Sequence, residues 1–130
     1  MTGRVLVVDD DPPLRQMVAR MLASRGFAVE TASTGREGIQ ALRDGFRGVM
    51  LLDYRMPDMD GHETLLAMSE EGLADGVIVC MLTGLQQPTE PLERHGATVL
   101  NYIVKPFGRD ALVAAVEDAA ALLGDLGDGP

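Results

Sequence analysis

The stretch that indicates the fold is LLDYRMPDMDG, residues 51–61, in which two leucines lead directly into Asp53. With Val49 and Met50 before it, the apolar run is four residues long. Such a run is too short for a helix and is typical of a strand that is buried on both faces. Arg, Met, Pro and Gly residues follow the aspartate. The segment therefore predicts a buried parallel strand that ends on a carboxylate.

Similar apolar runs recur along the chain and predict the rest of a sheet. They are VLVV (5–8), VIVCML (77–82) and YIV (102–104), and all three are rich in the β-branched residues Val and Ile. A further segment, FAVET (27–31), is less apolar and suits the edge of a sheet. Five parallel strands are thus expected.

Helical patterns separate these runs. Between residues 14 and 22, apolar side chains share one face, with Asp11 as the expected N-cap: Leu14, Met17, Val18, Met21 and Leu22. Capping-box spacing predicts helix starts near Thr34, with Glu37, and at Asp60, with Glu63. A last helix is expected over about 108–123. Because strand and helix alternate throughout, the sequence predicts an α/β fold, a doubly wound sheet with helices on both faces.

Size and charge limit the classes of function. The 130 residues suffice for one domain, expected over residues 1–124 with a flexible, acidic, Gly-rich tail at 125–130. A net charge of −9 and a pI near 4.5 disfavour binding to nucleic acid or to anionic membranes. With no long apolar segment and no signal-peptide pattern, a cytoplasmic location is expected.

Polar residues stand at the predicted carboxyl ends of four strands. They are Asp9 and Asp10 after the first, then Asp53, Thr83 and Lys105. Ligands of doubly wound sheets bind outside these strand ends. One aspartate at a strand end would as readily be a turn or capping residue. Five polar residues at one edge instead favour a functional site.

Three carboxylates close together need a cation to stay ionised. Oxygen ligands open to water suit Mg²⁺, with Mn²⁺ as an alternative, whereas the sequence has no His or Cys cluster for zinc. A bound divalent ion would admit a phosphoryl group to the acidic pocket, where Lys105 and Thr83 would contact its remaining oxygens.

These motifs together resemble the response-regulator receiver domains of two-component signalling, and the chemotaxis regulators in particular. The resemblance rests on VLVVDDDPPLRQ, LLDYRMPDMDG, the Thr83-Gly84 pair and YIVKPF, and it covers residues from Arg4 to about Leu123. It implies a flavodoxin-like sheet with strand order 2-1-3-4-5. It also implies a phosphoacceptor signalling protein, which is no enzyme on external substrates but catalyses its own phosphorylation and dephosphorylation.

The resemblance assigns a role to each site residue. Asp53 would accept the phosphoryl group from the phosphohistidine of a sensor histidine kinase or histidine phosphotransfer protein, and the phosphorylated protein would act on a downstream protein target. Magnesium would be held by three carboxylates and one backbone carbonyl, those of Asp9, Asp10, Asp53 and Arg55 respectively. The phosphoryl group would be bound by Thr83, Gly84 and Lys105. The switch would involve the Thr83 hydroxyl and the Tyr102 ring. Asp10 is expected to bind the ion directly and Asp9 largely through water. The family also typically has a cis bond before the residue matching Pro106.

One segment departs from the family pattern. TVLN, residues 98–101, is two residues longer than the usual spacing before Tyr102, and the segment after Thr83 contains Pro88 and Pro91. Proline disfavours helix interiors. We therefore expect a short or broken fourth helix over 85–96 and an early start to the fifth strand.

Two other classes of function remain as alternatives. A receiver-like interaction module that works without phosphate would be favoured by the loss of Asp10, Asp53 or Lys105, all of which are present. A magnesium-dependent phosphohydrolase needs a second acid shortly after its nucleophile, where this chain has Arg55. The cognate kinase, the output target and the oligomeric state stay open, as does the question of a stand-alone protein or part of a larger regulator.

Overall fold

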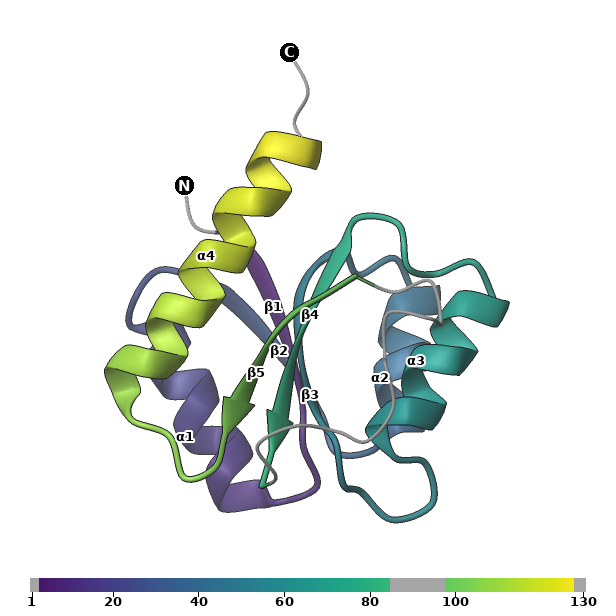
Figure 1. Cartoon of the computed structure of the whole chain (residues 1–130), viewed down its shortest axis with the longest axis horizontal. Coiled ribbons are helices and arrows are strands. Elements are labelled where there is room, and N and C mark those ends of the chain that lie inside the picture. The colour runs from purple at the N-terminus through teal and green to yellow at the C-terminus, as the bar shows by residue number, and fades with distance from the viewer. Residues whose placement is uncertain (1–2, 85–97, 128–130) are drawn as a thin grey trace.

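The sheet is the centre of the computed structural model, which describes residues 3–84 and 98–127 (Figure 1). Its five parallel strands have the order β2-β1-β3-β4-β5, which confirms the flavodoxin-like fold expected from the sequence. The strands are β1 (Arg4–Val8), β2 (Ala28–Ala32), β3 (Gly48–Asp53), β4 (Val77–Thr83) and β5 (Thr98–Val104). As predicted, the less apolar β2 lies at an edge.

The helices form one layer on each face of the sheet. They are α1 (Pro12–Ala23), α2 (Gly35–Arg43), α3 (Gly61–Glu70) and α4 (Arg109–Gly127). Figure 1 shows α1 and α4 on one face and α2 and α3 on the other. None of the helices in the described part of the chain combines the length and the apolar character that crossing a membrane requires.

The residues that the structure describes form two separate hydrophobic cores, which follow from the two-residue period of the strands. On β1, Leu6 and Val8 face the α2–α3 layer, whereas Val5 and Val7 face the α1–α4 layer. The same alternation continues through β3 and β4. Because both faces are covered, the strands are apolar at nearly every position, and this explains the short continuous runs in the sequence.

The helix starts confirm the capping predictions with one correction. The Asp11 carboxylate accepts the Leu14 N–H, and in α3 Asp60 and Glu63 form the complete reciprocal capping box. In α2, the Thr34 hydroxyl accepts the Glu37 N–H, but the Glu37 carboxylate instead accepts from the N–H and hydroxyl of Ser33. The predicted box is therefore only half formed, because the adjacent serine offers two donors.

The apolar face of α1 is narrower than predicted. Val18 and Leu22 are fully buried, but the Met17 side chain, expected on the same face, is 41% exposed. At the other end of the chain, α4 extends to Gly127. Its backbone thus includes the first three residues of the segment 125–130 that the sequence assigns to a tail, while residues 128–130 lie outside the described part.

Strand β5 begins early, as the long spacing predicted. Its pairing with β4 shifts register between Val79 and Cys80, so that Leu100 is the extra residue of a bulge and Asn101 lies opposite Cys80. A bulge absorbs one inserted residue without disturbing the rest of the ladder. The short or broken helix expected over 85–96 falls in the undescribed segment 85–97.

Candidate functional site

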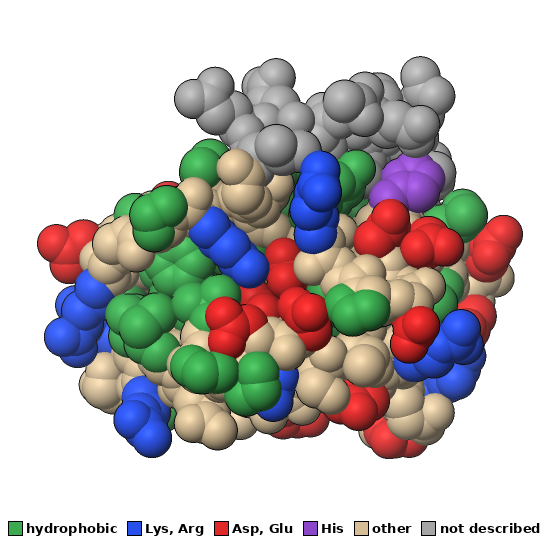
Figure 2. All heavy atoms as spheres, turned by 90° about the horizontal axis from the view of Figure 1, so that it is seen from below, with side chains coloured by type: hydrophobic (Ala, Val, Ile, Leu, Met, Phe, Trp, Pro, Cys, Tyr) green, Lys and Arg blue, Asp and Glu red, His purple; other side chains and the backbone are tan. Residues whose placement is uncertain are grey.

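The carboxyl edge of the sheet brings the five predicted polar residues together. Asp53 and Thr83 end β3 and β4, Asp9 and Asp10 follow β1, and Lys105 follows β5. Figure 2 looks onto this edge and shows acidic side chains gathered near its centre. Their proximity follows from topology, because β1, β3, β4 and β5 are consecutive neighbours in one parallel sheet.

Backbone hydrogen bonds join the strand ends to one another. The Tyr54 N–H donates to the Leu82 carbonyl at 2.8 Å, and the Lys105 N–H donates to the Thr83 carbonyl at 2.7 Å. On the other side, the Asp9 N–H donates to Ala32 at the end of β2 at 3.1 Å. The site residues are thus carried by the rigid ends of the ladder.

Lys105 links two buried carboxylates. Its Nζ lies 3.2 Å from Asp9 Oδ2 and 3.3 Å from Asp53 Oδ1. Asp9 is fully buried and Asp53 is 4% exposed, whereas the Lys105 side chain is 26% exposed. The ammonium therefore bridges the two acids from the solvent side of the site.

Burial dominates the protonation of Asp53. Desolvation and the negative charge of Asp9 raise the pKa of Asp53 to about 6, against the opposing effects of Lys105 and of the Arg55 N–H, which lies 3.3 Å from Asp53 Oδ1. For Lys105, burial favours a lower pKa, but the charges of Asp53 and Asp9 outweigh it, so the pKa is raised. At neutral pH the cluster holds an ionised Asp53 carboxylate beside the charged Lys105 ammonium.

The carboxylates fit a divalent cation. Asp9, Asp10 and Asp53 each offer an oxygen, and these oxygens all lie within 4.8 Å of one another. All the donors are hard oxygens, and Asp10 is exposed, so that waters can complete the coordination shell. This donor set suits Mg²⁺ or Mn²⁺ better than zinc.

Asp9 is held at each of its polar atoms. Besides the bonds to Ala32 and Lys105, its Oδ1 accepts the Asp11 N–H at 2.9 Å, and its carbonyl accepts from Arg15 Nη1 at 2.6 Å. The sequence did not point to Arg15. The available signal was its place in the first turns of the helix that directly follows the two aspartates, within reach of the end of β1.

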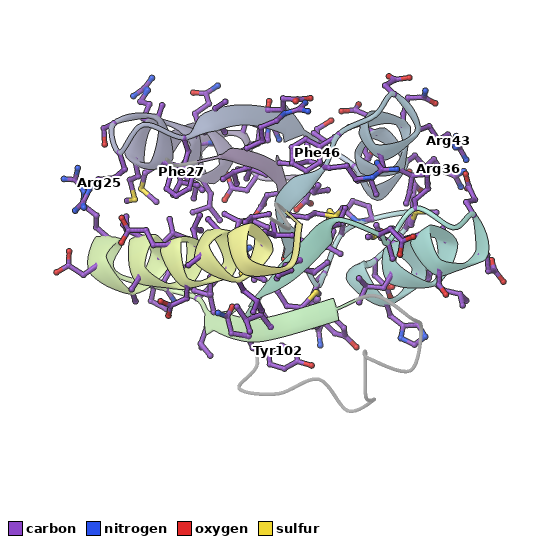
Figure 3. All side chains as sticks on the ribbon, turned by 90° about the horizontal axis from the view of Figure 1, so that it is seen from above. Arg25, Phe27, Arg36, Arg43, Phe46 and Tyr102 are labelled. Atoms are coloured by element: carbon purple, nitrogen blue, oxygen red, sulfur yellow. The ribbon has the colours of Figure 1, made fainter. Side chains whose placement is uncertain are left out.

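The remaining predicted residues belong to the same strands or to the segments that follow them. Thr83 is buried, Gly84 is exposed directly after it, and the Arg55 side chain is exposed. Tyr102 is half-buried, and Figure 3 shows its ring at the outer edge of β5. The Lys105–Pro106 peptide bond is cis.

Gly61, the last residue of the segment LLDYRMPDMDG, packs against β3, the strand that ends on Asp53. Its N–H donates to the Tyr54 carbonyl at 2.8 Å, and a Cβ on it would lie 3.1 Å from the Asp53 carbonyl oxygen and 2.7 Å from Met81 Cε. A side chain at this position would crowd the backbone at the end of β3, so glycine lets α3 begin close to Asp53.

Comparison with protein families and solved structures gives a consistent result. Residues 5–117 match the model of the response regulator receiver domain. The regulatory protein AtoC of Escherichia coli K12 is 32% identical over 120 residues, which is 92% of this chain but 26% of AtoC. The response regulator MprA of Mycolicibacterium vanbaalenii is matched over 48% of its length, so this chain spans a quarter to a half of such curated relatives.

Two solved structures show the same fold. A CheY-like receiver domain protein of Methanospirillum hungatei superposes with a TM-score of 0.87 at 34% identity, covering 95% of this chain and 98% of the other. The response regulator TrrA of Thermotoga maritima superposes with a TM-score of 0.77 at 26% identity, covering 92% and 99% respectively. TrrA was crystallised in complex with Mg²⁺ and BeF.

Proposed function

Because the chain belongs to the response-regulator receiver family of two-component signalling, we infer that it is a magnesium-dependent phosphoacceptor in which Asp53 carries the phosphoryl group. The observation that supports this assignment most strongly is the contact of Asp53 Oδ1 with Lys105 Nζ at 3.3 Å, inside a cluster with Asp9 and Asp10. Asp53 ends the central strand β3, contacts the Lys105 ammonium and lies within 4.8 Å of the carboxylate oxygens of Asp9 and Asp10.

In the proposed reaction, Asp53 attacks the phosphorus of a phosphohistidine on a sensor kinase or phosphotransfer protein. An Asp53 oxygen forms the new O–P bond as the N–P bond of the donor breaks, and the products are an acyl phosphate and a histidine. Phosphoryl transfer needs alignment and charge stabilisation more than covalent assistance. Asp53 is rigidly placed by β3, and its pKa of about 6 leaves it ionised at neutral pH.

Charge stabilisation comes from two sources in this proposal. Lys105 stays protonated beside Asp53 and would turn to the transferred oxygens. Asp9, Asp10, Asp53 and the backbone carbonyl of Arg55 would hold Mg²⁺, with Mn²⁺ as a substitute, and the ion would neutralise the negative charge of the phosphoryl oxygens. The hydroxyl of Thr83 and the N–H of Gly84 would donate to the same group.

The signal would pass from the phosphoryl group to β5. Thr83 lies opposite Val104 and Tyr102 lies opposite Met81 in the β4–β5 ladder, so the two residues belong to neighbouring, directly paired strands. The added charge would draw in the Thr83 hydroxyl, and the half-buried Tyr102 ring would take up the space that it leaves. Water would later hydrolyse the acyl phosphate, which makes the switch self-resetting.

The biological setting is proposed on the same basis. Residues 1–124 would form the receiver, acting in the cytoplasm on a downstream protein rather than on nucleic acid or a membrane. The chain spans a quarter to a half of the matched relatives, so their full activities are not assigned to it, and its output is tested by binding to a candidate target protein.

Intact-protein mass spectrometry tests the proposal. The protein is incubated with acetyl phosphate with and without Mg²⁺, in parallel with Asp53→Asn. We expect the mass of one phosphoryl group only in the wild type with Mg²⁺. Folded wild-type protein that gains no mass from acetyl phosphate or from a phosphorylated histidine kinase would contradict it and favour the phosphate-independent interaction module.

A further inference from the structure

The hydrogen bond from Arg15 to the Asp9 carbonyl connects α1 to the metal-binding loop. Arg15 Nη1 lies 2.6 Å from this oxygen, and the arginine side chain is half-buried. A bond from a charged donor at this distance is among the stronger hydrogen bonds in proteins. Its acceptor belongs to the peptide unit that joins Asp9 to Asp10.

This peptide unit determines the position of the Asp10 Cα. The carbonyl oxygen of Asp9 and the Cα of Asp10 lie in one plane, because the peptide bond is planar. A donor that holds the oxygen therefore limits rotation of the plane and displacement of the Asp10 Cα. The Asp9 side chain has two partners of its own, Lys105 and the Asp11 N–H, and depends less on this contact.

Asp10 has no comparable support of its own. It is exposed, and within residues 3–84 and 98–127 its carboxylate accepts no hydrogen bond and forms no ion pair. The direction of the Asp10 carboxylate, the proposed direct ligand of Mg²⁺, therefore depends on the position of the Asp10 backbone.

Arg15 acts on this loop without occupying the carboxylates. It forms no ion pair with Asp9, Asp10 or Asp53, all of which are described. Its charge also reaches α2: hydrogen bonds from Ser33, and to a smaller extent the charge of Arg15, lower the pKa of Glu37. The guanidinium thus holds the Asp9 carbonyl without an ion pair to any of the three carboxylates, so it does not compete with a cation for them.

We propose that Arg15 is a positioning residue for the magnesium site, which orients Asp10 through the Asp9–Asp10 peptide. This inference rests on the proposed function, since it assumes that the three carboxylates bind Mg²⁺. It goes beyond that function by assigning a role in metal affinity to a residue of α1 that touches neither the ion nor the phosphoryl group.

The sign of the effect separates positioning from simple charge. If Arg15 acted only as a nearby positive charge, its removal would tighten Mg²⁺ binding. If it positions Asp10, its removal weakens binding, by about tenfold for the loss of a partner of this kind. Arg15→Met keeps the apolar stem and removes the charge and the donors together, so the two hypotheses predict opposite changes.

Calorimetric titration with Mg²⁺ at constant ionic strength measures this directly. We expect Arg15→Met to raise the Kd by about tenfold and Arg15→Lys to raise it less, because lysine keeps the charge but loses the planar fork of donors. Arg20→Met is the matched control, since Arg20 is an exposed arginine in the last turn of α1, and its Kd should equal that of the wild type.

The outcomes are distinct. A folded Arg15→Met protein with an unchanged or lower Kd would overturn the inference. If that variant does not fold, Arg15→Lys decides, and a Kd equal to the wild type would overturn it. A wild type that binds no Mg²⁺ would instead contradict the proposed function, so the two failures are distinguishable.

Discussion

At the scale of single residues, the buried Asp53 connects reactivity to stability. Its folded-state pKa of about 6 lies above the ordinary value of 3.8, so the folded protein binds this proton more tightly than the unfolded chain. The contribution of Asp53 to stability is therefore fully present below about pH 4 and is lost as the pH rises through about 6. In the absence of a bound cation, Asp53 therefore favours folding least at the pH where its carboxylate is ionised.

Asp53→Asn should remove this pH dependence. In EDTA, we expect the free energy of unfolding of the variant relative to that of the wild type to rise by about 1–3 kcal/mol between pH 4.5 and pH 7.5. Urea denaturation of both proteins at the two pH values measures the change. A difference that is the same at both would show that Asp53 does not titrate in this range.

Lys105→Met should separate catalysis from metal binding. Without the ammonium, the transferred phosphoryl group loses a donor, and we expect phosphorylation by acetyl phosphate to slow by about 100-fold. Mg²⁺ should bind more tightly, since a competing positive charge is removed from Asp9 and Asp53. Mass spectrometry and calorimetry give the two values, with Lys105→Arg as the charge-preserving control; weaker Mg²⁺ binding would contradict this prediction.

The sequence predicted the residues of the site better than their contacts. Asp9, Asp10, Asp53 and Lys105 could be brought together because parallel strands align their carboxyl ends at one edge. Arg15 could not be found in this way, because the place of a guanidinium depends on four side-chain torsions and on the loop that it meets. The same limit applies to Glu37, whose carboxylate accepts the Ser33 N–H instead of the Thr34 N–H that a capping box requires.

At the scale of secondary-structure elements, the helix starts test how far local bonds stabilise the site. In α3, the Glu63 N–H donates to Asp60 Oδ1 at 2.8 Å and the Asp60 N–H donates to Glu63 Oε1 at 3.0 Å. In α2, only one of the two bonds of the box is present, from the Glu37 N–H to the Thr34 hydroxyl, because the Glu37 carboxylate accepts from Ser33 instead. The two helices therefore form a matched pair.

Asp60→Ala should destabilise the protein by about 1 kcal/mol, as expected for the loss of an N-cap. A double-mutant cycle with Glu63→Ala should show coupling between the two side chains, whereas the cycle of Thr34→Ala and Glu37→Ala should show less. Chemical denaturation of the variants measures both cycles. Equal coupling in α2 and α3 would mean that the reciprocal bonds of the box contribute nothing measurable.

Element boundaries were predicted where side chains determine them and were less certain where the backbone adjusts. Asp11 and Asp60 mark helix starts because their carboxylates satisfy free N–H groups. The bulge at Leu100 left no comparable mark in the sequence, because a leucine in a strand is not specific to a bulge. The early start of β5 was inferred only from the length of the insertion.

At the scale of the whole molecule, Mg²⁺ should stabilise the folded state. A ligand that binds only the native protein adds RT ln(1 + [L]/Kd), which is about 1.4 kcal/mol at tenfold excess over Kd. We expect the unfolding midpoint to rise with Mg²⁺ for the wild type but not for Asp10→Asn. Sodium chloride at matched ionic strength is the control, and an equal rise with it would assign the effect to screening of the acidic protein.

The sheet that separates the two hydrophobic cores has a consequence for how this domain can change. Leu42 and Leu65 belong to one core and Leu112 and Val116 to the other, and among the described residues no side chain is shared between the two. Substitutions on opposite faces should therefore be nearly additive, and each layer of helices can drift in sequence without the other having to compensate. Such a partition lets evolution rework one surface for a new partner while the opposite half preserves foldability.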